Sequence, residues 1–290
     1  MKRFIVLVLA LVAVTSAFGT KPQVRVSHVE PLSWWVGMNM PLQLMVNGEG
    51  IGACDVEILP AECGVVVTAV HKADSPNYIF VDVAISEDAK AGDYTLRFTN
   101  GKSKLDYKYT IAERREGSRE RESFTTADFV YLIMPDRFAN GNPTNDSTDD
   151  TAEKADRTKP GRRHGGDLEG MIAHLDYIAD LGATAIWSTP LLLDNENGAS
   201  YHGYSCSDYY RIDPRYGTNE LFKEYVEECH KRGLKVIMDI VPNHSSTTHW
   251  WYDDQPFTDW THQWDSYTQS NWTFSTNMDF NASQADLYQM

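Results

Sequence analysis

Residues 235–244 read KVIMDIVPNH, and this stretch decides the fold. Its apolar letters include β-branched residues and form a nearly unbroken run, which Asp239 interrupts and a proline ends. Such a run is typical of a strand in a parallel sheet that is covered on both faces. A carboxylate near the end of a buried strand is costly unless it has a partner. We therefore expect function at Asp239 and at His244, where the strand ends.

The sequence before this stretch alternates between strand and helix patterns. It predicts strands at residues 129–134 and 184–187 and amphipathic helices at residues 168–181 and 221–231. Asp167 stands where the first helix needs an N-cap, and Gly233 stands where the second helix needs a C-terminal glycine. Together with residues 235–244 this is a β-α-β-α-β succession, which predicts a parallel sheet. The pattern alone leaves open a closed barrel or an open, doubly wound sheet.

Residues 20–112 follow a different pattern, with short alternating strands between turns and no helical periodicity. The predicted strands are at residues 24–29, 42–46, 65–70, 78–85, 94–99 and 107–111. This spacing predicts a small, immunoglobulin-like β-sandwich. Trp34 and Trp35 fit either a sugar-stacking platform or the sandwich core, and core packing is the favoured interpretation. Residues 113–124 are dense in charges of both signs and are expected to form a solvated linker.

The chain of 290 residues carries a formal net charge of −15, which argues against a nucleic-acid partner. Residues 1–19 combine a basic start, a short apolar run and small residues, as in a cleaved secretory signal peptide. No cysteine for a lipid anchor lies near the cleavage point, and no later stretch is apolar enough to span a membrane. We expect a periplasmic or secreted protein. Cys54 and Cys63 are candidates for a disulfide, whereas Cys229 falls on the apolar face of a helix and is expected to be a buried thiol.

Six short motifs follow one another at the expected ends of strands and starts of helices. They are FANGNPTND at residues 138–146, HGGDL at 164–168, YHGY at 201–204, DYY at 208–210, IDPRYGT at 212–218 and DIVPNH at 239–244. In this order they resemble the α-amylase family of retaining glycoside hydrolases (glycoside hydrolase family 13), and within it the neopullulanase, cyclomaltodextrinase and maltogenic-amylase branch. The resemblance implies that the N-terminal β-sandwich is followed by the first part of a (β/α)8 TIM barrel, truncated after about three β/α units. The barrel part would span residues 125–290, with residues 245–280 as the start of an inserted loop domain.

Four residues in these motifs are candidates for the substrate site. Tyr204 lies in a loop at the catalytic face, where an aromatic ring can stack on a glucose ring; the alternative is a core tyrosine. By resemblance, His202 lies near substrate, unless it only braces its loop. By resemblance, His244 holds the glucose unit at the cleavage subsite, unless it caps a helix. The resemblance gives Asp239 a supporting role, in which it is buried and orients catalytic neighbours through a partner such as an arginine.

The loop after the first barrel strand is a candidate calcium site. Side-chain amides, carboxylates and backbone carbonyls at sharp turns are the oxygen ligands that Ca²⁺ prefers. In the neopullulanase branch this loop binds calcium together with the Gly-Gly-Asp segment, and the matching positions here are Asn140, Asn142, Asn145, Asp146, Gly165 and Asp167. Asn142 stands where related sequences often carry aspartate, so the site has lost a charge. The same residue types also form turns without any ligand, which is the alternative.

The resemblance implies an exported hydrolase of α-1,4-glucosidic bonds in pullulan, starch-derived maltooligosaccharides or cyclodextrins, acting by the retaining two-carboxylate mechanism. The catalytic carboxylates are expected beyond residue 290, so we expect the N-terminal part of a longer enzyme, inactive and poorly folded alone. The alternatives are a non-catalytic α-glucan-binding or scaffold protein on the same fold, and a related transglycosylase. A homo-oligomer through the sandwich is also expected. The aromatic residues of 249–272 fit either a sugar groove or packing within a loop.

Overall fold

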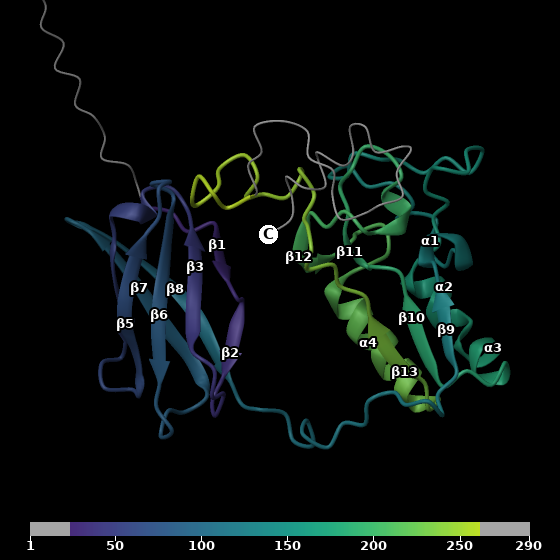
Figure 1. Ribbon diagram of the computed structural model, residues 1–290, viewed down its shortest axis with the longest axis horizontal. Coiled ribbons are helices and arrows are strands. Elements are labelled where there is room, and N and C mark those ends of the chain that lie inside the picture. The colour runs from purple at the N-terminus through teal and green to yellow at the C-terminus, as the bar shows by residue number, and fades with distance from the viewer. Residues whose placement is uncertain (1–23, 262–290) are drawn as a thin grey trace, which may run out of the picture.

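The computed structural model describes residues 24–261, which form a β-sandwich and an α/β unit (Figure 1). The linker between them runs along one side of the molecule, and residues 249–261 return to the sandwich on the opposite side. The expected signal peptide, residues 1–19, lies outside the described residues, as do residues 262–280 of the expected inserted domain. Within residues 24–261 no helix is both long enough and apolar enough to cross a bilayer.

The sandwich consists of two four-stranded sheets, with strand orders β1-β3-β6-β5 and β2-β8-β7-β4. Its elements are β1 (His28–Glu30), β2 (Ser33–Trp35), β3 (Leu42–Asn47), the 3₁₀ turn η1 (Ile51–Ala53), β4 (Asp55–Leu59), β5 (Val65–Lys72), β6 (Tyr78–Ile85), β7 (Gly92–Asn100) and β8 (Ser103–Ala112). Alternate side chains point inward, as Leu42, Leu44 and Val46 do on β3. The two inner faces share one apolar core, as in aligned sheet packing. The predicted immunoglobulin-like sandwich is confirmed.

Some details of the sandwich differ from the sequence prediction. The first strand is confined to β1, and the pattern does not predict β2 or β4. β2 has only three residues, and β4 (DVEIL) buries only its isoleucine fully. Trp34 packs against the sandwich core and stacks on Trp35 with ring centres 5.1 Å apart, in agreement with the favoured interpretation.

Three parallel strands form the sheet of the α/β unit, in the order β13-β10-β9. The elements are β9 (Val130–Ile133), α1 (Pro135–Phe138), α2 (Leu168–Ala173), α3 (Leu175–Asp180), β10 (Ala185–Ser188), β11 (Leu192–Leu193), the 3₁₀ turn η2 (Ser200–His202), β12 (Asp208–Ile212), α4 (Asn219–Lys231) and β13 (Lys235–Met238). In the central strand, Ser188 lies opposite Ile133 on one side and Met238 on the other. The three strands therefore end at one edge and deliver their loops to the same face, as at the start of a (β/α)8 barrel.

The first helix begins where the sequence predicts but is broken, and α4 begins two residues before the predicted start at residue 221. Asp167 caps α2 by accepting a hydrogen bond of 2.7 Å from the amide of Gly170, and Gly233 has φ of 72° after α4. The predicted single helix at residues 168–181 is wrong, because it divides at His174 into α2 and α3. The His174 imidazole donates through Nδ1 to the Gly170 carbonyl at 2.7 Å. The His174 backbone amide, which an α-helix would pair with that carbonyl, donates to the Met171 carbonyl instead.

The cysteines of the chain are free thiols. The Cys54 thiol donates to the carbonyl of Gly50 at 3.5 Å, and the Cys63 thiol donates to the carbonyl of Val65 at 3.3 Å. The candidate disulfide between Cys54 and Cys63 is therefore not formed. Cys229 is fully buried on α4, as predicted for a packed thiol.

Candidate substrate-binding site

Side chains from two neighbouring strand ends meet at Asp239, directly after β13. The Trp187 indole on β10 donates to Asp239 Oδ2 at 3.1 Å, and the Tyr204 hydroxyl donates to the same oxygen at 3.2 Å. Burial and the Asp239 carboxylate raise the pKa of Tyr204, so its hydroxyl stays a donor. Tyr204 is 38% exposed, which leaves its ring open to solvent. An open aromatic face with a fixed hydroxyl suits stacking on a sugar ring.

The surroundings of Asp239 differ from the expectation of a buried aspartate paired with an arginine. Asp239 is half-buried. Within residues 24–261 its hydrogen-bond partners are the indole of Trp187 and the hydroxyl of Tyr204. Both donors are neutral, and both bond to the same carboxylate oxygen.

His244 lies against the backbone of Tyr204. Its Nε2 is 3.0 Å from the Tyr204 carbonyl, which only accepts, and its Nδ1 is 3.2 Å from the amide nitrogen Nδ2 of Asn243, which only donates. These contacts fit an imidazole that donates through Nε2 and accepts at Nδ1. Because Asn243 is exposed, a sugar hydroxyl can take its place at Nδ1 while the bond to Tyr204 keeps the ring oriented.

His202 stands beside Tyr204 and also holds its backbone. The Tyr204 amide donates to His202 Nδ1 at 3.0 Å, and the two rings lie 5.8 Å apart. Burial lowers the pKa of His202, which agrees with an imidazole that accepts at Nδ1. The structure thus brings His202, Tyr204, Asp239 and His244 together at one edge of the sheet.

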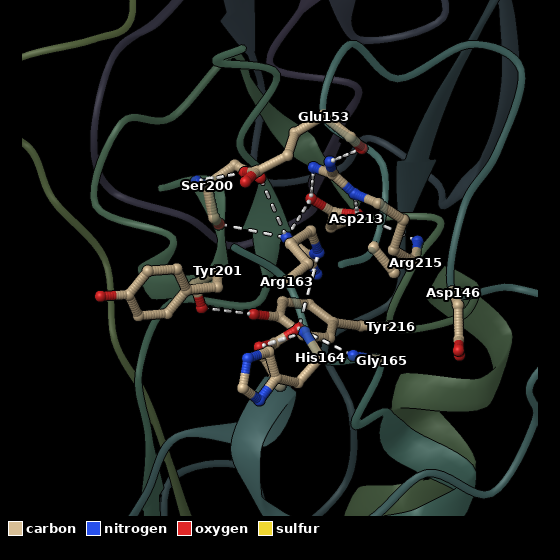
Figure 2. Close-up of polar contacts among 12 residues, drawn as sticks. Asp146, Glu153, Arg163, His164, Gly165, Ser200, Tyr201, Asp213, Arg215 and Tyr216 are labelled. Atoms are coloured by element: carbon tan, nitrogen blue, oxygen red, sulfur yellow. Dashed lines mark hydrogen bonds and ion pairs between the residues drawn. The ribbon is translucent and has the colours of Figure 1, made fainter. Parts of the chain in front are cut away.

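A network of buried charges lies beneath these loops (Figure 2). Arg163 is at its centre and is 1% exposed. Its Nη1 is 3.5 Å from Asp213 Oδ2 and donates to the Ser200 carbonyl at 3.1 Å. Its guanidinium carbon lies 4.5 Å from the centre of the Tyr216 ring. Arg215 is fully buried and donates to the two carboxylate oxygens of Asp213 at 2.9 and 2.7 Å.

The network joins the loop after β9 to the loop after β10. Arg215 donates to the carbonyl of Glu153 at 3.0 Å, and the Glu153 carboxylate accepts from the amide of Ser200 at 2.7 Å. Asp136, also buried, accepts from the amides of His164 and Gly165. Because the bonds of Arg215 and Glu153 are buried, they anchor the loop that carries His202 and Tyr204.

Two of the buried aspartates of this region, Asp213 and Asp194, have opposite pKa shifts. Burial alone would raise the pKa of Asp213, but the guanidinium groups of Arg163 and Arg215 more than offset it and hold the pKa below its ordinary value. Burial raises the pKa of Asp194 to about 7, although backbone amides donate to its carboxylate. Its Oδ2 lies 3.9 Å from His202 Nδ1. Within residues 24–261, a guanidinium bonds to the carboxylate of Asp213 and none bonds to that of Asp194, and this difference separates the two pKa values.

The candidate calcium residues come together between β9 and α2. Asn140 donates through Nδ2 to Asp146 Oδ1 at 2.6 Å. Gly165 has φ of +84°, and a Cβ there would lie 2.4 Å from the same oxygen, so only glycine fits. Asp167 accepts two backbone amides of the loop, at 3.0 and 2.8 Å.

Two of these residues have oxygens that suit a cation. Asn140 Oδ1 and Asn145 Oδ1 are buried and accept no hydrogen bond. Such orphaned acceptors are costly, and an oxygen-liganded cation would satisfy both. Asn142 is different, because its Oδ1 already accepts from the Thr144 amide at 3.1 Å. Across residues 24–261 no three His, Cys, Asp or Glu side chains group as a metal site. The candidate therefore combines the amide oxygens of Asn140 and Asn145 with the nearby carboxylates of Asp146 and Asp167, and both kinds of oxygen are calcium ligands.

Two family models match the chain, one in each of its two parts. Residues 132–285 match the α-amylase catalytic domain, and residues 28–115 match the N-terminal domain of cyclomaltodextrinase. A cyclomaltodextrinase of Geobacillus thermopakistaniensis is 41% identical over 44% of this chain and 20% of its own length. Neopullulanase 2 of Thermoactinomyces vulgaris is 41% identical over 43% of this chain and 22% of its own. A solved Anoxybacillus α-amylase is 43% identical, with a TM-score of 0.44, over 50% of this chain and 30% of that one.

The chain spans about a fifth of the length of the curated relatives that it matches. The catalytic-domain match alone covers more than half of the chain, and the match to the sandwich lies ahead of it in the expected order. The chain therefore belongs to the α-amylase family, and its relatives include the cyclomaltodextrinases and neopullulanases of the branch that its motifs resemble.

Proposed function

We propose that the protein to which this chain belongs is an exported glycoside hydrolase that cleaves α-1,4-glucosidic bonds in maltooligosaccharides, pullulan or cyclodextrins. The observation that carries the proposal is the group of Tyr204, Asp239 and His244 at the ends of two parallel barrel strands. Relatives named cyclomaltodextrinase and neopullulanase support the same substrate class. Export is proposed from the sequence of residues 1–19.

In this proposal the residues of the chain bind and orient the sugar. The Tyr204 ring stacks beneath the glucose unit at the cleaved bond, and Asp239 fixes the direction of its hydroxyl. His244 binds a sugar hydroxyl at Nδ1 in place of Asn243. The nucleophile and the acid/base are assigned to carboxylates on later barrel strands, about 5 Å apart as in retaining enzymes.

The proposal is tested by the stereochemistry of the product. The full-length protein is expected to hydrolyse maltoheptaose with retention of the α configuration, because carboxylates about 5 Å apart act through a covalent intermediate. NMR of the anomeric protons during the first turnovers measures this. Inversion would contradict the mechanism, and glucan binding without hydrolysis would favour the scaffold protein. Transfer to an added acceptor sugar in preference to water would identify a transglycosylase.

We further propose that the loop between β9 and α2 binds a structural Ca²⁺. Asn140, Asn145, Asp146, Asp167 and the carbonyl of Gly165 would hold the ion. The orphaned amide oxygens of Asn140 and Asn145 support this assignment. A bound ion would supply positive charge that ties the loop to the start of α2, while the contact of Asn142 with Thr144 shapes the turn.

Removal of calcium is expected to lower the melting temperature of the full-length protein. An ion at a hundred times its Kd contributes about 2.7 kcal/mol, which corresponds to a shift of several degrees. Asp146→Ala is expected to abolish this dependence. Asp149→Ala removes an exposed acid from the same loop and is the matched control. Melting curves with and without calcium decide the matter, and equal curves for the wild type would rule out the site.

A further inference from the structure

Residues 249–261 pack on the sandwich sheet β1-β3-β6-β5. Trp250 stacks on His28 of β1, with ring centres 3.9 Å apart and planes 3° from parallel. Phe80 of β6 lies 5.6 Å from the ring of Phe257. Figure 1 shows this segment, drawn in yellow, over the ends of β1 and β3. The described rings of this segment therefore pack against the sandwich and against one another, and residues 262–272 of the aromatic stretch lie outside the described residues.

Asp254 is the polar anchor of this contact. Its two carboxylate oxygens each accept a hydrogen bond of 2.7 Å, one from the Ser75 hydroxyl and one from the side-chain amide of Asn77. Both donors belong to the turn between β5 and β6, and the Ser75 amide donates to the carbonyl of Pro256 at 3.1 Å. Hydrogen bonds to an ionised acceptor are about twice as strong as neutral ones. The turn thus holds both a side chain and the backbone of the segment.

A second set of contacts connects the docked segment to His244. Trp251 is 6% exposed, stacks on His249 with ring centres 3.8 Å apart, and lies 6.2 Å from the ring of Tyr209. The Tyr209 hydroxyl donates to the carbonyl of His244 at 2.9 Å and lies 3.2 Å from that of Val241. The loop that carries His244 is therefore held between the barrel and the sandwich.

We infer that the sandwich positions His244 for substrate by holding residues 249–261, and that Asp254 is the positioning residue that fastens this contact. The inference rests on the proposed function, because it takes His244 as a contact of the sugar. Only residues 245–248 separate His244 from the docked segment. Ser245 and Ser246 are buried within that link, so it has little slack to absorb a displacement.

The kinetic test compares variants of the full-length protein. Asp254→Ala is expected to raise KM for a maltooligosaccharide about tenfold and to change kcat less than about twofold, because it displaces a binding group of an intact site. Asp254→Asn still accepts from Ser75 and can pair with the Asn77 amide, so its KM is expected to stay close to that of the wild type. Asp259→Ala, which removes an exposed acid from the same segment, is the matched control.

A double variant tests whether the two sides of the contact act together. Asn77→Ala alone is expected to raise KM. Asn77→Ala with Asp254→Ala is expected to match Asp254→Ala, because Asp254→Ala already removes the hydrogen bond that Asn77 makes. If Asp254→Ala does not fold, the KM of Asn77→Ala is compared with that of Asp259→Ala instead. Additive increases in KM would overturn the pairing of these two side chains.

Hydrogen exchange measures the contact without any substrate. Amides of residues 241–251 are expected to exchange faster in Asp254→Ala and Asn77→Ala than in the wild type or in Asp259→Ala. Unchanged exchange and unchanged KM in a folded, active variant would overturn the inference. The two proposals can fail separately. If the wild type hydrolyses no α-glucan while both variants still exchange faster than the wild type, the proposed function is overturned and the docking of the segment stands.

Discussion

Replacement of Asp213 by alanine is expected to lower the free energy of unfolding by about 3 to 5 kcal/mol, as when one partner of a buried ion pair is removed. The carboxylate is fully buried, bonds twice to the Arg215 guanidinium and lies 3.5 Å from that of Arg163. Without it, two buried guanidinium groups would lose their closest counter-charge. Urea unfolding of the full-length protein, followed by circular dichroism, measures the loss.

Two further variants show whether burial causes this effect. Asp213→Asn keeps the volume and an oxygen that accepts from Arg215, so it is expected to cost less than the alanine variant. Asp176 pairs with Arg232 at 2.6 Å, but its side chain is 82% exposed. Asp176→Ala is therefore expected to leave the unfolding midpoint almost unchanged. Equal losses for the two alanine variants would contradict a special role for the buried network.

Tyr204→Ala is expected to lower kcat/KM of the full-length protein on maltooligosaccharides about a hundredfold, because both the stacking ring and its oriented hydroxyl are lost. Tyr204→Phe keeps the ring and loses only the hydrogen bond to Asp239, so a loss of about tenfold is expected. Initial rates over a range of substrate concentrations measure both effects.

The control for Tyr204 is another exposed tyrosine. Tyr177 lies on α3, away from the strand ends, and is 54% exposed. Tyr177→Ala is expected to leave kcat/KM unchanged. A Tyr204→Ala protein that is less stable but equally active would show that Tyr204 serves the fold and not the sugar.

The sequence predicts the fold well where local pattern and tertiary packing agree. α4 ends at Lys231 before a glycine, and β13 is an apolar run, so both are found as expected, although α4 begins at Asn219 after an N-cap, Thr218, that the pattern does not predict. The break in the helix at residues 168–181 has a local cause that periodicity does not contain. The imidazole of His174 competes with the backbone amide of the same residue for the carbonyl of Gly170.

For the candidate site, the motifs identify residues but not their partners. They point to Tyr204, Asp239 and His244. In the structure the Tyr204 side chain bonds to Asp239, and the His244 side chain bonds to the Tyr204 backbone. They do not reveal that Trp187 donates to Asp239, because an indole on a strand looks like core packing. The aromatic residues after position 248 are likewise ambiguous until the sandwich is placed beside them.

The sequence does not predict the buried network, and the reason is different. Charged side chains are mostly exposed, so Arg163 and Asp213 are expected in solvent on composition alone. A single sequence holds no information on which acid meets which arginine across separate loops. The nearest signal is the IDPRYGT motif, in which Asp213 and Arg215 stand two residues apart between a helix and a strand.

The same network has a consequence for the order of folding. Arg215 and Glu153 lie 62 residues apart along the chain, so their contact closes a long loop before it contributes stability. Until every partner is in place, each of these charges is better solvated by water than by protein. Hydrophobic contacts among the strands and α4 carry no such penalty and can form first. We therefore expect the loops joined by this network to be the last part of this unit to reach their native shape.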